Sequence, residues 1–229
     1  MPIQKTKTEI AFIRKACEIT DAIFSGIIGD FRFSTERELM LSIRREIRKH
    51  GLREAFPPIV SGGARAGNEI HPSSTDASLE GFVIIDFGVR VHGYCSDMTR
   101  TLFVGRPTAK DKAAYKRVLD AKKAGEKHVV PEGKCAAADA AARAAMGPYK
   151  KYFIHTLGHG VGRRIHERPR IFFKRTEDVF KERMIVTVEP GMYIPKKLGI
   201  RIEDTYVVTE RGCAALTRSP QKLLVFPKK

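Results

Sequence analysis

Two stretches of the sequence repeat one pattern: an apolar run ends in an acid, a glycine follows two residues later, and a second acid comes further along. The first pair of acids is Asp86 and Asp97, and the second pair is Glu189 and Glu203. Antiparallel strands set such residues side by side, with Cβ atoms about 4.5–5.5 Å apart. A carboxylate among Val and Ile is costly to bury unless a positive charge compensates it. The duplication therefore predicts four carboxylates around one shared cation site.

The segments around these acids predict an α+β domain. Capping boxes predict helices that begin after Thr6, Thr35 and Thr108, and an Ala-rich run predicts a fourth helix from Cys135 to Met146. Short apolar runs separated by Gly, Pro and Ser predict strands after each helix pair, and residues 152–154 belong to the later group. Two helices and then strands, repeated, predict two pseudo-symmetric halves, each with a helix pair and an antiparallel hairpin around a central site.

Length and composition predict a globular intracellular protein. No linker or low-complexity tract divides the 229 residues, so we expect one domain over residues 1–229, without a separate N-terminal domain. Four widely spaced cysteines form no C-x-x-C pair, which argues against a zinc knuckle or a disulfide framework. The first residues lack the apolar core of a signal peptide, and no segment approaches the ~20 apolar residues of a membrane span. We therefore expect a cytoplasmic protein without a membrane partner.

The charge of the chain is strongly positive. Lys and Arg number 42 against 26 Asp and Glu, which gives a net charge of +16. A basic surface of this size can attract nucleic acid or acidic partners. No nucleic-acid-binding motif accompanies the charge, so we expect a solvated basic surface rather than a nucleic-acid interface.

A fifth candidate ligand lies between the two acid pairs. His159 has a glycine on each side, so little side-chain bulk hinders its approach to a metal ion. One imidazole and four carboxylates form a hard, oxygen-rich site that suits two divalent ions such as manganese, cobalt, iron or zinc. The same set argues against a structural zinc site.

The motifs around these residues resemble those of the pita-bread metallopeptidases (family M24), which include Xaa-Pro dipeptidases (prolidases), aminopeptidase P and methionine aminopeptidases. The matching segments cover nearly the whole chain: 85–88, 93–101, 158–162, 166–169, 188–193 and 199–204. The resemblance is to the catalytic domain of the prolidase and aminopeptidase P branch. The methionine aminopeptidases have His-Gly where this chain has His71 and Pro72.

This resemblance implies a dinuclear metal centre with Mn²⁺ as the expected ion and Co²⁺, Fe²⁺ or Zn²⁺ as alternatives. It implies that Asp86 binds one ion, that His159 and Glu189 bind the other, and that Asp97 and Glu203 bridge both. A hydroxide shared by the two ions would attack the amide carbonyl. Glu189 would accept its proton and later pass a proton to the leaving amine.

The resemblance also implies catalytic or substrate-binding roles for His71, His155 and His166, and a substrate-binding role for Arg201. An imidazole, His166 or His71, would stabilise the oxyanion of the tetrahedral intermediate. The implied substrate is a peptide or dipeptide with proline in the second position. The neighbouring Arg163 and Arg164 depart from the family pattern, and the sequence leaves open whether they line the cleft.

Two other functions stay open at this point. One is an exopeptidase of the methionine aminopeptidase type, and the other is a non-catalytic pita-bread module that binds protein or nucleic acid. A binding module would be expected to have lost metal ligands, and this chain has all five. The resemblance also leaves a homodimer open.

Overall fold

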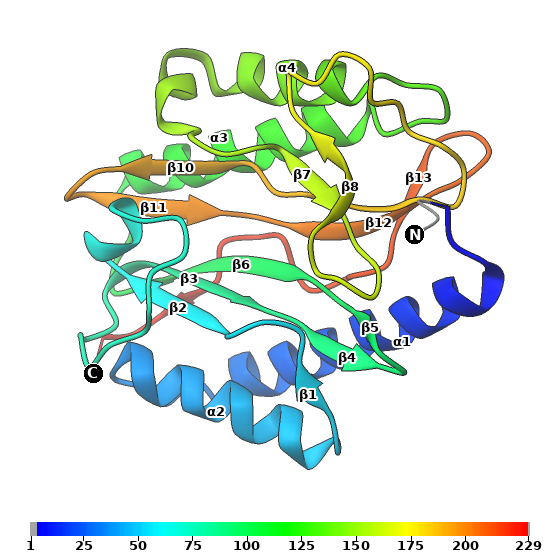
Figure 1. The fold of residues 1–229 in the computed structure, drawn as a ribbon. Helices are drawn as coiled ribbons and strands as arrows, with labels where there is room; N and C mark the ends of the chain where they lie inside the picture. Colours follow the sequence, from blue (N-terminus) through cyan, green and yellow to red (C-terminus); the bar gives the residue numbers. More distant parts are fainter. Residues whose placement is uncertain (1–3, 229) are drawn as a thin grey trace.

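Two helix pairs enclose the strands of the protein from opposite sides (Figure 1). In the computed structural model, which describes residues 4–228, α1 (Lys7–Gly29) and α2 (Glu36–Lys49) form one pair. The other pair consists of α3 (Ala109–Glu126) and α4 (Cys135–Met146). The prediction that no signal peptide is present rests partly on the first three residues, which lie outside the described part. Within residues 4–228, no helix is both long and apolar enough to cross a membrane.

Local sequence signals begin the first three helices where they were predicted. The hydroxyl of Thr6 accepts a hydrogen bond from the backbone N–H of Glu9, whose carboxylate accepts one from the N–H of Thr6. The same reciprocal capping box opens α2 at Thr35 and α3 at Thr108. Because these bonds satisfy N–H groups that the helix itself leaves unpaired, they fix the helix starts. The three capping predictions are confirmed.

The first half of the strands forms one main sheet and one smaller sheet. The main sheet has the order β14-β6-β3-β2, and the smaller one has the order β1-β4-β5. The elements of this half are β1 (Arg53–Glu54), β2 (Ile59–Gly62), the 3-10 turn η1 (Arg65–Gly67), β3 (Gly81–Phe87), β4 (Val89–Val91), β5 (Tyr94–Cys95), β6 (Met98–Val104) and, from the end of the chain, β14 (Val225–Phe226).

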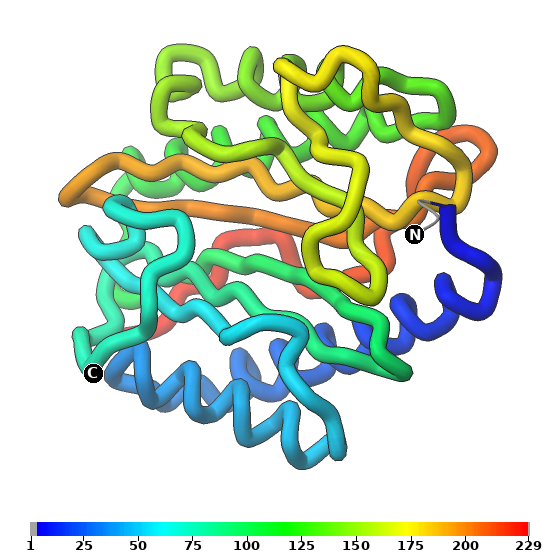
Figure 2. The backbone as a smooth tube through the Cα atoms, in the orientation of Figure 1, coloured from blue at the N-terminus to red at the C-terminus, as the bar shows by residue number. Residues whose placement is uncertain are grey.

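The second half has a corresponding arrangement. Its main sheet has the order β13-β12-β9-β7-β8, and β10 and β11 form a separate two-stranded ribbon. Figure 2 shows this ribbon, in orange, beside the cyan segment around η1 of the first half. The elements are the 3-10 turn η2 (Gly147–Tyr152), β7 (Gly158–Gly160), β8 (Glu167–Ile171), β9 (Ile185–Val188), β10 (Gly191–Ile194), β11 (Leu198–Arg201), β12 (Asp204–Val208) and β13 (Cys213–Ala215).

Each helix pair covers its own sheet. Phe24 of α1 and Leu39 of α2 are buried in one apolar cluster with Ile85 of β3. Val118 of α3 belongs to a second cluster that includes Val186 of β9. Because each pair of helices buries its apolar face on one sheet, the two halves repeat the same layering. The predicted α+β fold with two pseudo-symmetric halves is confirmed.

Two local predictions were wrong. Residues 152–154 do not form a strand, because Tyr152 ends η2 and Arg143 donates hydrogen bonds to the carbonyl oxygens of Phe153 and His155. These carbonyls are therefore bonded to a guanidinium instead of a neighbouring strand. The pattern of residues 200–203 also predicts a strand that carries Glu203, but Glu203 occupies the break between β11 and β12.

Candidate metal centre

The first pair of acids lies where β3 and β6 meet. Asp86 is in β3 and pairs with Thr99 of β6, while Asp97 directly precedes β6. Asp97 is therefore two residues away from the position opposite Asp86. The two acids are close neighbours across the antiparallel pair without being direct partners.

The second pair lies where β9 and β12 meet. Val188 of β9 pairs with Asp204 of β12, so the same register continued by one residue sets Glu189 opposite Glu203. The backbone N–H of Glu203 donates a hydrogen bond of 3.0 Å to the carbonyl oxygen of Thr99 in β6. This bond joins the two halves at the point where the acids converge.

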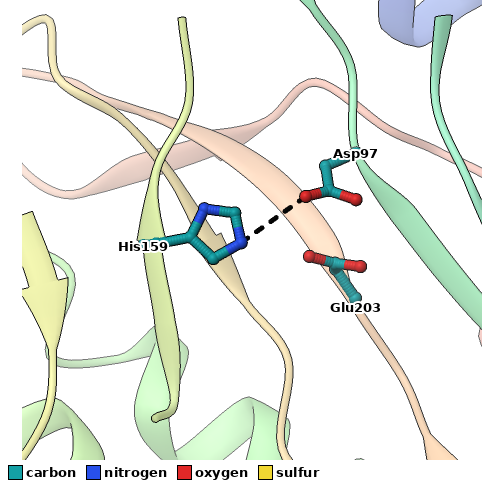
Figure 3. Close-up of side chains that lie close together, drawn as sticks. All are labelled: Asp97, His159 and Glu203. Atoms are coloured by element: carbon teal, nitrogen blue, oxygen red, sulfur yellow. Dashed lines mark ion pairs between the residues drawn. The ribbon is translucent and has the colours of Figure 1, made fainter. Parts of the chain in front are cut away.

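His159 brings a nitrogen ligand to the acids. Its Nε2 atom lies 3.2 Å from Oε1 of Glu189 and 3.5 Å from Oδ2 of Asp97. One ligand atom from each of Asp97, His159 and Glu203 lies within 4.8 Å of the others, and Figure 3 shows their side chains facing one another. The Nδ1 atom is 3.1 Å from the carbonyl oxygen of Gly160, which leaves Nε2 directed at the acids.

The glycines beside His159 have a packing role. A Cβ atom on Gly158 would lie 2.1 Å from the carbonyl oxygen of Thr187, and one on Gly160 would lie 2.1 Å from that of Arg168. Both distances are well below a permitted contact, so only glycine lets β7 approach its neighbours this closely. The glycines were predicted to give His159 access to a metal, and in the structure they allow the close packing of β7 against β8 and β9.

Two oxygens at the centre have no hydrogen-bond partner among residues 4–228. Oδ2 of Asp86 accepts a hydrogen bond of 2.6 Å from Arg201, while its Oδ1 is buried and unpaired. Oε2 of Glu203 accepts one of 2.7 Å from the hydroxyl of Thr99, while its Oε1 is also buried and unpaired. A buried carboxylate oxygen without a donor is unfavourable unless a cation binds it. The donor set therefore fits hard divalent ions.

The pKa values reflect the crowding of the acids. Burial, together with the neighbouring carboxylates, raises the pKa values of Asp97 and Glu203 well above their ordinary range. Burial would also raise the pKa of Glu189, but the hydrogen bond and charge of His159 outweigh it and lower this pKa to about 2. Glu189 is therefore the acid of this group that stays ionised most readily.

A cavity of about 390 Å³ opens over the five candidate ligands. One wall is apolar and the other walls carry imidazoles and acids. The lining residues are Phe56, Pro57, Pro58, Ile59, His71, Pro72, Ser73, Asp86, Asp97, His159, Ile165, His166, Glu189 and Glu203. All five predicted ligands thus border one cavity, together with two of the three additional histidines.

Two of the additional histidines, His71 and His166, line this cavity. The ring of His166 meets that of His159 edge to face, with 4.4 Å between the centroids. Burial lowers the pKa values of both His71 and His166, and the nearby cationic groups lower them further. Both imidazoles are therefore neutral at physiological pH, and each then has one N–H donor and one acceptor nitrogen.

His155 and Arg201 do not line the cavity. Nε2 of His155 lies 3.1 Å from the hydroxyl of Tyr193, and Nη1 of Arg201 donates to the same hydroxyl at 2.7 Å. Arg201 also binds Asp86, so a chain of contacts runs from His155 through Tyr193 to that carboxylate. Tyr193 and Thr99 were missed as candidate residues, although both lie in the segments that resemble the family.

A second cavity of about 510 Å³ adjoins the first, and His166 lines both. The other residues that line it are four arginines and two acids: Arg164, Arg168, Arg170, Arg175, Glu167 and Asp178. Arg164 thus faces this cavity. Arg163 instead lies over the ring of Tyr94, with the guanidinium carbon 5.4 Å from the ring centroid.

The two-half fold is that of the pita-bread metallopeptidases. Comparison with protein families gives the same result, because the profile of metallopeptidase family M24 matches residues 11–210. The chain belongs to this family.

Individual relatives are prolidases and related peptidases. The chain is 41% identical over 228 residues to the Xaa-Pro dipeptidase of Pyrococcus furiosus, a match that covers 97% of this chain and 65% of the relative. Among solved structures, a prolidase from Pyrococcus furiosus matches with a TM-score of 0.90 at 40% identity, covering 95% of this chain and 66% of that one.

An X-Pro aminopeptidase from Thermotoga maritima matches with a TM-score of 0.92 at 34% identity, covering 97% of this chain and 64% of that one. The chain spans about 65% of the length of the first curated relatives that it matches. The fold similarity thus covers nearly all of this chain and about two thirds of the relatives.

Proposed function

We propose that the protein is a dinuclear metal-dependent peptidase that hydrolyses the bond between an N-terminal residue and proline. The observation that carries the proposal is that five ligand-type side chains border one cavity in a chain of family M24. Asp86 would bind one ion, His159 and Glu189 the other, and Asp97 and Glu203 both. We expect Mn²⁺ to support the activity. Two bound divalent ions lower the pKa of a shared water toward neutrality, which makes it a nucleophile for an amide carbonyl.

Glu189 is our candidate for the proton carrier. A base must be ionised and must lie beside both the nucleophile and the substrate. Glu189 borders the cavity, and its lowered pKa keeps it ionised at physiological pH. It would accept the proton of the attacking water and return a proton to the nitrogen of the leaving proline.

The imidazoles of His71 and His166 are our candidates for oxyanion stabilisation. Both line the cavity, and a neutral imidazole has one N–H group that can donate a hydrogen bond to the developing negative charge. His155 and Arg201 lie behind the cavity. We propose that these two act through Asp86, whose carboxylate they orient by way of Tyr193 and the direct ion pair.

The shape of the cavity supports a proline-containing substrate. Phe56, Pro57, Pro58 and Ile59 form an apolar wall beside the candidate ligands, which suits the apolar face of a pyrrolidine ring. The arginine-lined cavity beyond His166 would bind the carboxylate of a dipeptide, since guanidinium groups bind carboxylates through paired hydrogen bonds. This arrangement favours Xaa-Pro dipeptides over longer peptides.

Peptide hydrolysis by the metal-reconstituted protein tests the proposal. The metal-free protein should be supplied with Mn²⁺, Co²⁺, Fe²⁺ or Zn²⁺ and assayed on Xaa-Pro dipeptides, Xaa-Pro-Xaa tripeptides and Met-Ala-Xaa peptides. We expect the dipeptides to be cleaved fastest with Mn²⁺. Faster cleavage of Met-Ala-Xaa would favour a methionine aminopeptidase activity. Cleavage of none with any metal would favour the non-catalytic binding module.

One substitution separates the proposed chemistry from binding. Glu189→Gln should lower turnover by roughly a thousandfold or more, because it alters the base and a metal ligand together. The exposed Glu182, seven residues earlier, offers a matched control, and Glu182→Gln should leave turnover unchanged. Near-normal activity of Glu189→Gln would remove this residue from the mechanism.

A further inference from the structure

One buried carboxylate outside the metal centre is bonded to the loop that carries His71. The side chain of Glu36, in the first turn of α2, is fully buried. Its Oε1 accepts hydrogen bonds from the N–H of Gly62 at 2.9 Å and from Nε of Arg65 at 3.2 Å. Its Oε2 accepts from the N–H of Thr75 at 2.9 Å and from the hydroxyl of the same residue at 3.0 Å.

The donors come from the two ends of one loop. Gly62 is the last residue of β2 and Arg65 begins η1, whereas Thr75 follows the segment 71–73 that lines the metal cavity. Glu36 therefore ties the beginning of the loop to its end. The cavity wall formed by His71 and its two successors lies between these two attachments.

The bonds of Glu36 are not needed to begin the helix. Thr35 and Glu38 already form the capping box of α2, and they satisfy the N–H groups at its start. Glu36 instead directs its carboxylate away from the helix and toward the loop. The cation paired with it is Arg65, whose side chain is 41% exposed. A buried carboxylate with so exposed a counter-charge is a poor source of stability, so its bonds act mainly on conformation.

Other hydrogen bonds also hold the loop on either side of His71. The hydroxyl of Ser74 is bonded to the N–H and to the carbonyl oxygen of Val60, at 3.0 Å each, and Oδ1 of Asn68 accepts a hydrogen bond of 2.8 Å from the N–H of Lys196. These bonds do not involve Glu36.

Two guanidinium groups also contact the loop. Arg65 donates to the carbonyl oxygen of Ser73 at 2.9 Å, and Arg201 donates to that of Ile70 at 3.0 Å. The contact of Arg65 depends on Glu36, because the same guanidinium binds Oε1. Loss of the Glu36 carboxylate would therefore remove one attachment at each end of the loop and free the guanidinium that spans it.

We propose that Glu36 is a positioning residue that sets the place of His71 and the adjoining cavity wall. Its effect on catalysis rests on the function proposed above, whereas its effect on the loop does not. Substitution by Gln keeps the size of the side chain but replaces one acceptor oxygen by a donor. At one end of the loop, the amide N–H of the substituted side chain then meets a donor of the loop, and the hydrogen bond at that end is lost.

The first test measures the loop itself. Hydrogen exchange followed by mass spectrometry should show faster exchange of the amides in residues 63–74 in Glu36→Gln, by roughly tenfold, and wild-type exchange in α2. Asp76, which forms an exposed ion pair with Arg37 at the same junction, is a matched control. Asp76→Asn should leave exchange in residues 63–74 unchanged. Wild-type exchange in Glu36→Gln, or faster exchange throughout the protein, would overturn the proposal.

The second test asks whether Glu36 acts through His71. Glu36→Gln should lower kcat/KM on an Xaa-Pro dipeptide by roughly tenfold, mainly through kcat because His71 would act on the oxyanion, with Mn²⁺ stoichiometry unchanged. In a His71→Ala background the same change should alter kcat/KM by less than about twofold, since the residue it positions is absent. Equal effects in both backgrounds would overturn the proposal.

Two further measurements cover the cases in which the variant does not fold or the wild-type protein is inactive. If Glu36→Gln does not fold, Thr75→Val, which removes one donor to Oε2, replaces it in both experiments with a smaller expected change of the same pattern. If the wild-type protein cleaves no peptide, the proposed function fails, and the exchange measurement still decides whether Glu36 holds the loop.

Discussion

The two halves of the metal centre place their acids differently. In the second half, the register of β9 and β12 sets Glu189 opposite Glu203. In the first half, Asp86 is opposite Thr99, and Asp97 is offset by two residues. The position of the second acid, directly before β6 in one half and directly before β12 in the other, is the feature that both halves keep: Asp97 precedes Met98 and Glu203 precedes Asp204. The first acid has shifted along its strand between the two halves.

The halves also differ in how the first acid is compensated. Glu189 faces His159, which belongs to the same half, while Asp86 is paired with Arg201, which comes from the other half. In return, Thr99 of the first half donates to Glu203 of the second. Each half therefore supplies a donor for an acid of the other. Because each half depends on a donor from the other, neither half has a complete site by itself.

The largest predicted effect tests whether the halves contribute equally. Asp97→Asn in the first half and Glu203→Gln in the second should each lower kcat/KM by about 10⁴-fold, as expected when one member of a catalytic unit is lost. Each should also bind less Mn²⁺ per chain, measured by titration of the metal-free protein. A variant that keeps wild-type Mn²⁺ binding would show that its half does not share the ions.

The second prediction breaks the ion pair that joins the halves. Arg201→Met leaves the buried carboxylate of Asp86 without its counter-charge, which should lower the free energy of unfolding of the metal-free protein by about 3–5 kcal/mol. Arg44→Met, at a half-exposed pair with Glu54, is the control and should lower it by about 1 kcal/mol or less. Urea denaturation measures both. Equal losses would mean that the cross-half pair is no more than a surface contact.

Much of this site followed from local sequence patterns, and the missing parts are those set by strand register. The capping boxes and the glycines beside His159 are signals that lie within a few residues of each other, and the acids of each pair are only eleven and fourteen residues apart. The contact of Thr99 with Glu203 joins residues about a hundred positions apart, and no local pattern reports it. Likewise, Arg201 was expected at the substrate, whereas its guanidinium is buried against Asp86.

The sequence also did not predict which single polar groups are buried. Glu36 reads as an ordinary first-turn acid of a helix, since acids are common there. Its carboxylate is buried only because the loop after β2 folds back over α2. Sequence patterns therefore indicated the candidate metal ligands, but not the groups that hold these ligands in place. That residues 1–229 form one domain stays a prediction.

The third prediction concerns the donor that the first half supplies. Thr99→Val removes the hydroxyl that donates to Glu203 and accepts from Arg201, at a nearly unchanged side-chain volume. Residues that orient metal ligands in this way typically change metal affinity by about 10–100-fold, and we expect a loss within this range. Mn²⁺ titration by calorimetry measures it. Thr101→Val would be an unsuitable control because Thr101 is itself bonded to Arg201, so the exposed Thr176→Val serves instead.

The last prediction is a change in the pH dependence of stability, and it concerns an imidazole of the second half. Burial lowers the pKa of His155 from 6.5 to about 4. Between these two values the unfolded chain binds a proton that the folded chain does not, so this residue lowers stability as the pH falls through that window. The loss levels off below about pH 4. His155→Gln removes the titration, so its stability should fall less than that of the wild type between pH 6.5 and 4, by at most about 1.4 kcal/mol per pH unit.

Denaturation at a series of pH values measures this difference, because the contributions of the acids are common to both proteins and cancel. If His155→Gln follows the wild-type curve, the imidazole is solvated in the folded protein. The contact between His155 and Tyr193 would then not exclude water, and the chain from His155 to Asp86 would lose its first member.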